Sequence, residues 1–301
     1  MTFSRRQFLC AAAAGLALPT RVWAASDLTL GAMQIRTLSD GHLTLPAEFI
    51  FGPMPQDELP AVLDQHGVAH GPLHPDCNVT LLQHEDRVVL FDAGSGPGFQ
   101  DSSGQLIDAL GASGLTPEDV THVVFTHCHP DHLWGVLDDF DDPLFVNAEH
   151  MMGQAEWDYW FDPDTANTIQ PERTTMAVGA RRRLEVIEDQ MKLFADGDEI
   201  LPGVAAFATP GHTPGHMAFE LRDGSQSAMV LGDAIGNHHV AFARPDWQSG
   251  ADQDRDQAVQ TRMRLLDRLT SEQMQLIGYH LPDGGMGRAE RDGNSYRFVA
   301  G

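Results

Sequence analysis

The stretch 125-FTHCHPDHLWG-135 concentrates three histidines and one aspartate within six residues. These four side chains, His127, His129, Asp131 and His132, all offer atoms that bind divalent metal ions. The whole chain has 15 histidines in 301 residues, so its composition does not account for the cluster. The stretch predicts one wall of a metal site, and other segments should supply the remaining ligands.

Three apolar segments elsewhere also end in metal-binding side chains. "VAAFATPGH" ends at His212, "SAMVLGD" at Asp233 and "QLIGYH" at His280. Because ligands converge at the carboxyl ends of strands in such sheets, we expect these side chains to join the first cluster. One ion would then be held by His127, His129 and His212, and a second by Asp131, His132 and His280, with Asp233 bridging the two.

Seven such ligands suit two divalent ions about 3.5–4 Å apart, and zinc is the first expectation. The pair would hold a shared hydroxide as nucleophile and polarise a carbonyl or phosphoryl oxygen. Besides its ligand role, Asp131 is the candidate catalytic residue, since its carboxylate could pass a proton to the leaving group. These features predict hydrolysis of an ester-like bond in a small molecule: a lactone, ester, thioester or phosphotriester.

The rest of the chain reads as strands that alternate with helices. Residues 78–92 predict a hairpin that turns near Glu85, and residues 143–150 predict another strand. The clearest helix spans 251–270, where acids come first and arginines follow, in keeping with the helix dipole. Its apolar stripe is expected on Val259, Met263 and Leu266, with Ala258, Leu265 and Leu269 beside it. This organisation predicts a sheet core covered by helices.

Several motifs resemble those of the metallo-β-lactamase fold of metallo-hydrolases: "THCHPDH", "GHTPGH", "LGDA" and the late His280. Upstream, "VLFDAG" resembles the strand and loop of that family that contain Asp92. The resemblance covers residues 25–301 and implies an α+β fold, an αββα sandwich of two central mixed sheets with helices outside. It carries over all seven ligands, gives Asp92 a structural role and leaves His216 as a packing or hydrogen-bonding residue.

Within that family, "LSDGHLTLP", "EWDYW" and "GMGRAERDGNSYRFV" resemble exported methyl parathion hydrolases and acyl-homoserine-lactone lactonases. This resemblance implies a substrate pocket lined by Trp160, with Phe49 and Phe51 as weaker candidates. Residues 281–284 read Leu-Pro-Asp-Gly, where that branch has aromatic residues, which disfavours a hydrophobic organophosphate substrate. β-Lactamases usually carry Cys or Ser in place of Asp233, so this aspartate argues against β-lactam hydrolysis.

The first 24 residues predict a signal peptide. Arg5 and Arg6 precede a short apolar run, and small residues follow as a cleavage site, after Ala24 or Ala25. "SRRQFL" resembles the twin-arginine signal, so we expect the twin-arginine export machinery to carry the chain to the periplasm. No other apolar run is long enough to span a bilayer, so residues 25–301 predict a single domain without a membrane anchor after processing.

The charge of the chain narrows its partners. Its formal net charge is −24, and the signal removes three arginines and no acid. Such a field repels nucleic acid, so a small-molecule substrate is the expected partner, and a homodimer stays open. Cys77 and Cys128, the cysteines that remain after processing, are expected to be free.

Two other functions stay open at this point. A mononuclear iron dioxygenase that acts on persulfides shares much of this ligand set, and iron content with oxygen uptake would distinguish it. A non-catalytic periplasmic protein that binds metal or a partner would hold two zinc ions but turn over no ester.

Overall fold

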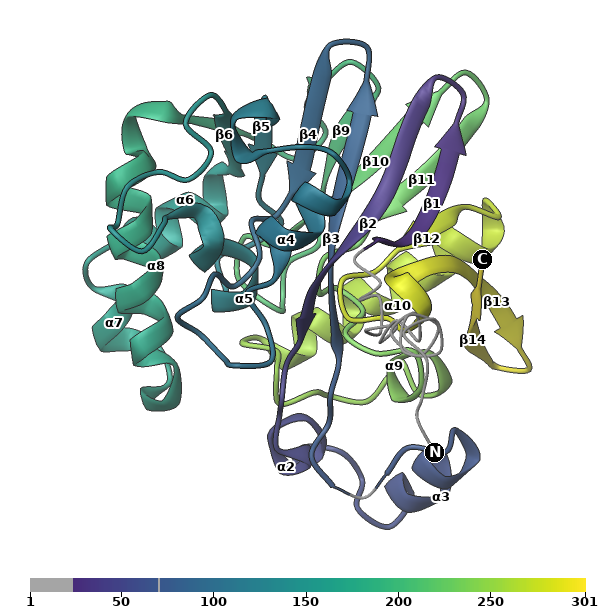
Figure 1. The fold of residues 1–301 in the computed structure, drawn as a ribbon. Helices are drawn as coiled ribbons and strands as arrows, with labels where there is room; N and C mark the ends of the chain where they lie inside the picture. The colour runs from purple at the N-terminus through teal and green to yellow at the C-terminus, as the bar shows by residue number, and fades with distance from the viewer. Residues whose placement is uncertain (1–23, 70) are drawn as a thin grey trace, which may run out of the picture.

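The structure, a computed structural model, describes residues 24–69 and 71–301. The signal peptide predicted for residues 1–24 lies outside this part of the chain, apart from Ala24. Two seven-stranded sheets form the centre of the described part (Figure 1). The strands of the first sheet lie in chain order: β1 Ala24–Leu30, β2 Met33–His42, β3 Asp76–His84, β4 Arg87–Phe91, β5 His122–Val124, β6 Glu149–Gly153 and β7 Met191–Phe194.

The second sheet has the order β14-β13-β12-β11-β10-β9-β8. Both sheets are mixed, because β4 to β7 pair in parallel in the first and β11 with β12 in the second, while the other neighbours are antiparallel. The strands of the second sheet are β8 Glu199–Leu201, β9 Val204–Ala208, β10 Met217–Asp223, β11 Gln226–Val230, β12 Gln275–Ile277, β13 Met286–Asp292 and β14 Ser295–Ala300.

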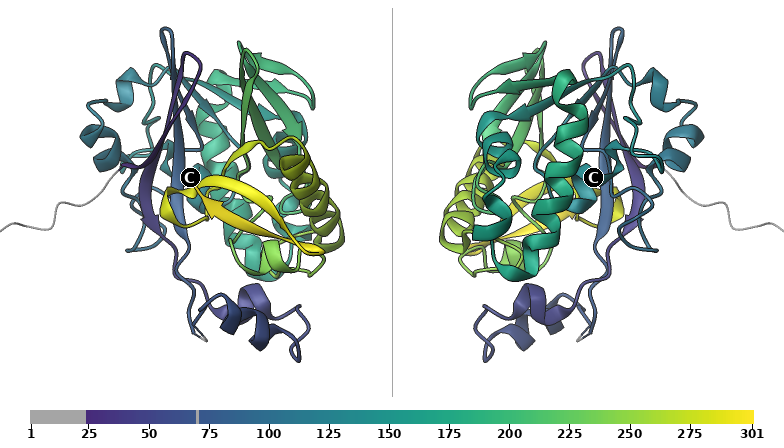
Figure 2. Two further views of the ribbon diagram at one scale, coloured as in Figure 1. Left: turned by 90° about the vertical axis from the view of Figure 1, so that its right-hand side faces the viewer. Right: turned by 90° about the vertical axis from the view of Figure 1, so that its left-hand side faces the viewer.

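Helices cover the outer faces of both sheets (Figure 2). Side chains of α4, α6 and α8 share one buried cluster with the first sheet, and α10 shares another with the second. The predicted αββα sandwich is therefore confirmed. The helices are α2 Ala47–Phe51, α3 Leu59–Gln65, α4 Leu106–Ala112, α5 Pro130–Leu133, α6 Gln154–Phe161, α7 Thr165–Thr168, α8 Thr174–Ile187, α9 Val240–Ala243 and α10 Arg255–Ser271, with 3-10 turns at Pro117–Asp119, Trp134–Val136, Pro171–Arg173, Glu188–Gln190 and Asp283–Gly285.

The inner strands are apolar on both sides because each face is covered. On β3, Leu81 packs towards the helices, whereas its neighbour Leu82 packs between the sheets, as the two-residue period of a strand requires. Across the sheet interface, the rings of Phe91 and Phe219 lie 5.2 Å apart. Each such fully buried side chain stabilises the fold by about 1.5–3 kcal/mol. This packing fixes the strand ends that carry the site.

One of the predicted strands differs from the structure. The hairpin of 78–92 is confirmed and turns at Glu85, which has a φ of 56°. The strand predicted for 143–150 is wrong except at its end, since β6 begins only at Glu149. Pro143 instead forms an isolated bridge, and the segment turns so that Phe145 is buried in the core while Val146 is 55% exposed.

Helix α10 confirms the predicted helix but turns a different face to the core. It starts after Asp254, whose side chain accepts a hydrogen bond from the backbone N–H of Gln257 at 3.0 Å. Met263, placed on the expected stripe, is 43% exposed, because the flanking positions make the contact with the sheet instead. The buried apolar face consists of Ala258, Leu265, Leu266 and Leu269.

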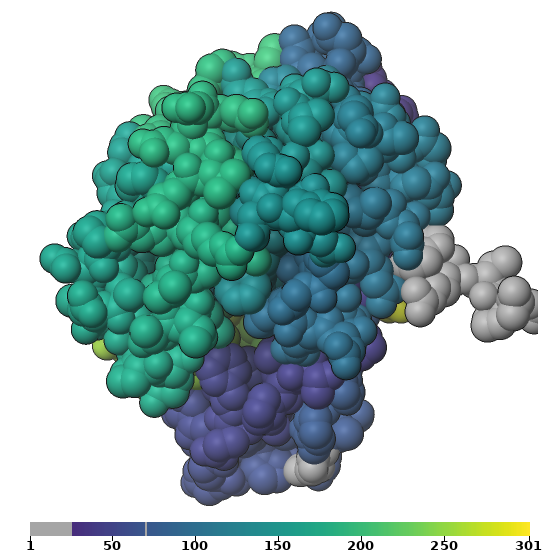
Figure 3. Space-filling model, turned by 60° about the vertical axis from the view of Figure 1, so that its left-hand side comes forward, coloured from purple at the N-terminus to yellow at the C-terminus, as the bar shows by residue number. Residues whose placement is uncertain are grey.

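An arm formed by residues 43–69 and 71–75 leaves the first sheet between β2 and β3. Its helices α2 and α3 pack with α9 and Trp247 in a separate small cluster, here called the arm cluster: Ile50, Phe51, Met54, Leu59, Leu63, Val240 and Trp247. In Figure 3 the arm, in purple and blue, lies against one end of the body. Among the described residues, no helix has the length and apolar character needed to cross a membrane.

Candidate metal centre

The first group of candidate ligands forms where the loop after β5 meets the loop after β9. His129 precedes α5 in an extended conformation, with Pro130 as the first helical residue. Its Nδ1 atom lies 3.0 Å from Nε2 of His127 and 2.8 Å from Nε2 of His212. The three nitrogens thus converge on one point and could hold one metal ion.

The second group lies beside the first, on α5 and on the loop after β12. Oδ2 of Asp131 lies 3.3 Å from Nε2 of His132 and 3.2 Å from Nε2 of His280. All three residues are largely buried. Two imidazoles and a carboxylate facing one another in this way could hold a second ion.

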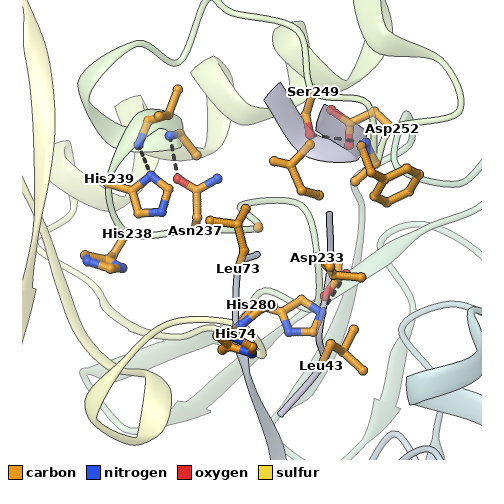
Figure 4. Close-up of a pocket in the computed structure, with 18 of the residues that line it drawn as sticks. Leu43, Leu73, His74, Asp233, Asn237, His238, His239, Ser249, Asp252 and His280 are labelled. Atoms are coloured by element: carbon orange, nitrogen blue, oxygen red, sulfur yellow. Dashed lines mark hydrogen bonds and ion pairs between the residues drawn. The ribbon is translucent and has the colours of Figure 1, made fainter. Parts of the chain in front are cut away.

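Asp233, just after β11, stands between the two groups. Its Oδ2 atom is 3.3 Å from Nε2 of His212 in the first group and 3.2 Å from Nε2 of His280 in the second. Its Oδ1 atom is 3.2 Å from Nε2 of His132. Figure 4 shows Asp233 beside His280 in the pocket. The structure therefore brings all seven predicted ligands together, with Asp233 at the bridging position.

Polar atoms of this centre lack the partners that burial demands. Oδ2 of Asp131, Nε2 of His132 and Oδ1 of Asp233 are buried and have no hydrogen-bond partner among the described residues. Buried polar atoms are rarely left unpaired, because their desolvation is costly. A divalent cation would meet all three, so the donor set fits a metal pair.

The charges of His127, His129 and Asp233 suit a cation. Burial lowers the pKa of His127 and His129 well below the usual value, which keeps their nitrogen lone pairs available for a metal. Burial alone would raise the pKa of Asp233, but His280 and His132 outweigh it and lower that pKa well below the usual value. The carboxylate is therefore ionised, as a bridging ligand must be.

The Nδ1 atoms of several candidate histidine ligands form hydrogen bonds on the side away from the candidate metal position. Nδ1 of His132 lies 2.8 Å from Oδ2 of Asp92, whose carboxylate also accepts from the backbone and hydroxyl of Thr126. Nδ1 of His280 donates to the backbone carbonyl of Asp76 at 2.7 Å. Such contacts fix the tautomer and leave Nε2 free for a metal. Asp92 thus lies where the family resemblance placed a structural residue.

The role of Asp252 could not be predicted from the sequence. Its Oδ1 atom lies 3.1 Å from Nδ1 of His212, and Nη1 of Arg262 approaches its Oδ2 atom at 3.5 Å. Asp252 had been assigned only to the acidic start of the helix over 251–270. In the sequence, Asp252 and the helix cap Asp254 both look like acids at the start of a helix. Nothing there distinguishes a residue that caps the helix from one that contacts His212.

Glu156 on α6 is the second residue that sequence reasoning missed. Its Oε1 atom accepts from the backbone of Cys128 at 2.9 Å and from the indole of Trp160 at 2.6 Å. Its Oε2 atom accepts from the hydroxyl of Thr213 at 2.8 Å and the backbone of Gly215 at 3.0 Å. This buried carboxylate therefore ties together the two loops of the first group. A glutamate four residues before a tryptophan on one helix was the available signal.

The remaining histidine and cysteines near the centre have structural contacts. Nε2 of His216 accepts from the backbone of Asp233 at 3.0 Å, so His216 holds the bridging residue rather than facing the ion. Cys77 and Cys128 are free and buried, as predicted. Although Cys77 lies close to the second group, burial raises the pKa of its thiol to about 12, which keeps it protonated.

A pocket of about 430 Å³ opens onto the centre. The body supplies one wall, and the arm supplies much of the other, so the site is sheltered between the two. Five of the seven candidate ligands line it: His129, Asp131, His212, Asp233 and His280.

The three aromatic residues expected at the pocket lie in different places. Phe49 lines it, and Arg173 sits over the ring of Phe49 at 5.8 Å. Phe51 is buried in the arm cluster and is not among the lining residues. Trp160 is fully buried behind His129, with the two rings 5.8 Å apart, and does not line the pocket because its indole is bound to Glu156.

A buried set of five imidazoles and two carboxylates at the mouth of a sheltered pocket is the arrangement of a metal-dependent hydrolase. The chain belongs to the Metallo-beta-lactamase superfamily, because residues 75–272, more than half of its length, match the model of that family. The family resemblance drawn from the motifs is thereby confirmed.

Solved structures and curated proteins resemble the chain over different lengths. AidC, a dizinc quorum-quenching lactonase, superposes with a TM-score of 0.86 and 24% identity over 93% of this chain and 98% of its own. The hydrolase AbOPH of the beta lactamase superfamily gives a TM-score of 0.86 and 27% identity over the same shares. The N-acyl homoserine lactonase AttM of Agrobacterium fabrum is 27% identical over 42% of this chain and 44% of its own.

Proposed function

We propose that the protein is an exported hydrolase that uses two divalent metal ions, zinc as first expectation, to cleave a lactone or a related ester of a small molecule. The observation that carries this proposal is the position of Asp233, whose carboxylate contacts the first group through His212 and the second through His280. A single carboxylate shared in this way supports a paired centre.

Two divalent ions bound there would lower the pKa of a water molecule and polarise the bond to be cleaved. The chain itself supplies position and shelter. Asp131 lines the pocket beside His280, so its carboxylate can carry a proton towards the leaving group. The apolar side chains of the arm exclude bulk water from the substrate, which strengthens the electrostatic interactions at the centre.

The substrate class rests on the relatives and on the charge. AidC and AttM are named as lactonases, and AbOPH as a hydrolase, which supports a lactone first. Esters, thioesters and phosphotriesters undergo the same chemistry and remain members of the proposed class. The net charge of −24 disfavours strongly anionic substrates. Export to the periplasm by the twin-arginine machinery is part of the proposal and rests on residues 1–24.

The test starts from protein collected from the periplasmic fraction of expressing cells. Near two divalent metals per chain are expected, together with turnover on a panel of lactones, esters, thioesters and phosphotriesters. Asp131→Ala and His212→Ala should each lower turnover at least about 100-fold, because each removes a ligand from one group. A control outside the pocket, the half-buried His84→Ala at the end of β3, should retain full activity.

Other outcomes would contradict distinct parts of the proposal. Full activity in either ligand variant would contradict the paired centre. One iron per chain, with oxygen uptake on a persulfide, would identify a dioxygenase instead. Two metals without turnover on any ester would indicate a binding protein, and absence from the periplasmic fraction would contradict export.

A further inference from the structure

The pocket has a second polar region, at the start of α9. Nδ1 of His239 accepts a hydrogen bond from the backbone N–H of Val240 at 2.8 Å, so the ring proton must sit on Nε2. Oδ1 of Asn237 accepts from the backbone of Ala241 at 3.0 Å, which leaves the amide NH₂ as a donor. His239 and Asn237 both line the pocket, and backbone contacts have fixed each of them as a donor towards it.

Two further residues that line this region carry an unpartnered nitrogen. The indole N–H of Trp247 and Nε2 of His66 are buried and have no hydrogen-bond partner in the part of the chain that the structure describes. Because these nitrogens lie beneath the pocket surface, the donors that reach the pocket in this region come from His239 and Asn237. Trp247 packs in the arm cluster with Val240, which places its ring next to the start of α9.

The region offers donors but no free charge. Burial lowers the pKa of His239 to about 3, so its ring is neutral and keeps the Nε2 proton at physiological pH. Arg244, one of the arginines that line the pocket, is already paired with Glu58 at 2.6 Å and with Asp246 at 3.3 Å. An alkyl tail placed here would leave the donors unpaired, and the lining arginines that an anion would meet already have partners among the described residues.

A metal ion does not fit this region. Of the side chains that lie close enough together to share an ion, the described residues give groups only around the candidate metal centre. His66, His238 and His239 are absent from all of them, although they are near enough to affect one another's charge. The region therefore suits an organic hydrogen-bond acceptor.

We propose that Asn237 and His239 form a subsite for an uncharged carbonyl or hydroxyl oxygen on the part of the substrate remote from the scissile bond. Figure 4 shows Asn237 and His239 apart from His280 and Asp233, each with a dashed line to the backbone. The subsite rests on the proposed function and narrows it, since it selects lactones and esters with an oxygen-bearing chain over those with a plain alkyl chain.

The test compares matched substrates of equal chain length, one with a keto or hydroxyl oxygen at successive positions and one with methylene there. At the best position, wild type should prefer the oxygenated member by about tenfold in kcat/KM, chiefly through KM. Asn237→Asp keeps the oxygen that accepts from Ala241 but replaces the donor with an acceptor, so this preference should fall about tenfold.

Asn294→Asp is the matched control, because it makes the same change on an exposed turn between β13 and β14 and should leave the preference intact. Calorimetry with non-hydrolysable amide analogues of each pair, on the metal-loaded protein, separates the subsite from the reaction. Equal affinities of wild type for both members at every position would overturn the subsite, even if the esters are cleaved. Discrimination without any ester turnover would support the subsite and overturn the proposed hydrolysis.

Discussion

The imidazoles of the metal centre are oriented by different kinds of acceptor. His132 is held by a buried carboxylate, His212 by Asp252, and His280 by a backbone carbonyl. A carboxylate behind an imidazole raises its basicity and hence its strength as a ligand, whereas a carbonyl mainly fixes its orientation. The first group thus has a carboxylate behind His212, and the second has a carboxylate behind His132 and a carbonyl behind His280.

Glu156 should matter more for loop geometry than for any single contact. In Glu156→Gln, the amide NH₂ must face either the backbone N–H of Gly215 or that of Cys128, both of which are donors. We expect the variant to lose about 1–3 kcal/mol of unfolding free energy near pH 5. Urea denaturation of metal-depleted protein measures the loss, and the exposed Glu185→Gln should show almost none.

The same variant has a signed pH dependence. Burial raises the pKa of Glu156 from 4.5 to about 7, so between these values the folded state holds a proton that the unfolded state has released. Wild type therefore loses stability relative to Glu156→Gln as the pH rises from about 4.5 to about 7. The difference in unfolding free energy between wild type and Glu156→Gln should therefore shrink over this pH range. A difference that grows with pH would contradict the raised pKa.

At the scale of elements, the sequence predicted the ligands at strand ends better than the residues that hold those ligands in place. His212, Asp233 and His280 were found because each follows an apolar strand, and the order of strands decides where such ends meet. Glu156 and Asp252 were missed because a single acid on a helix, or just before one, looks the same whether it faces solvent or a ligand. Their roles depend on contacts between elements far apart in the chain.

The contact between α6 and the loop that carries His212 leaves no room for a side chain. A Cβ on Gly215 would lie 2.1 Å from the backbone nitrogen of Glu156, and backbone on both sides cannot move independently. Gly215→Ala should therefore lower the midpoint of thermal unfolding by several degrees and weaken metal binding together. Gly98→Ala, where nothing lies within 4 Å, is the control and should change neither. An unchanged metal affinity in Gly215→Ala would show that this packing does not position the ligands.

At the scale of the whole molecule, the candidate centre joins the two halves of the sandwich. The loop of residues 127–132 follows β5 of the first sheet. His212, Asp233 and His280 follow β9, β11 and β12 of the second. Ions held there would cross-link the sheets at one edge of their interface. The chain also carries a net charge of −24, and metal cations would offset part of this charge at two buried acids, Asp131 and Asp233.

Metal removal should therefore destabilise the entire fold rather than the site alone. A ligand that binds only the folded state stabilises it by about 2.7 kcal/mol at a hundredfold excess over its dissociation constant. The midpoint of thermal unfolding should rise with free zinc concentration in wild type and rise much less in Asp233→Asn, because that change weakens the contact to both groups. Sodium chloride at matched ionic strength screens the acidic surface alike in both proteins and serves as the control. Equal zinc dependence in the two proteins would mean that Asp233 does not bridge the ions, and the cross-link between the sheets would then have to run through the remaining six ligands.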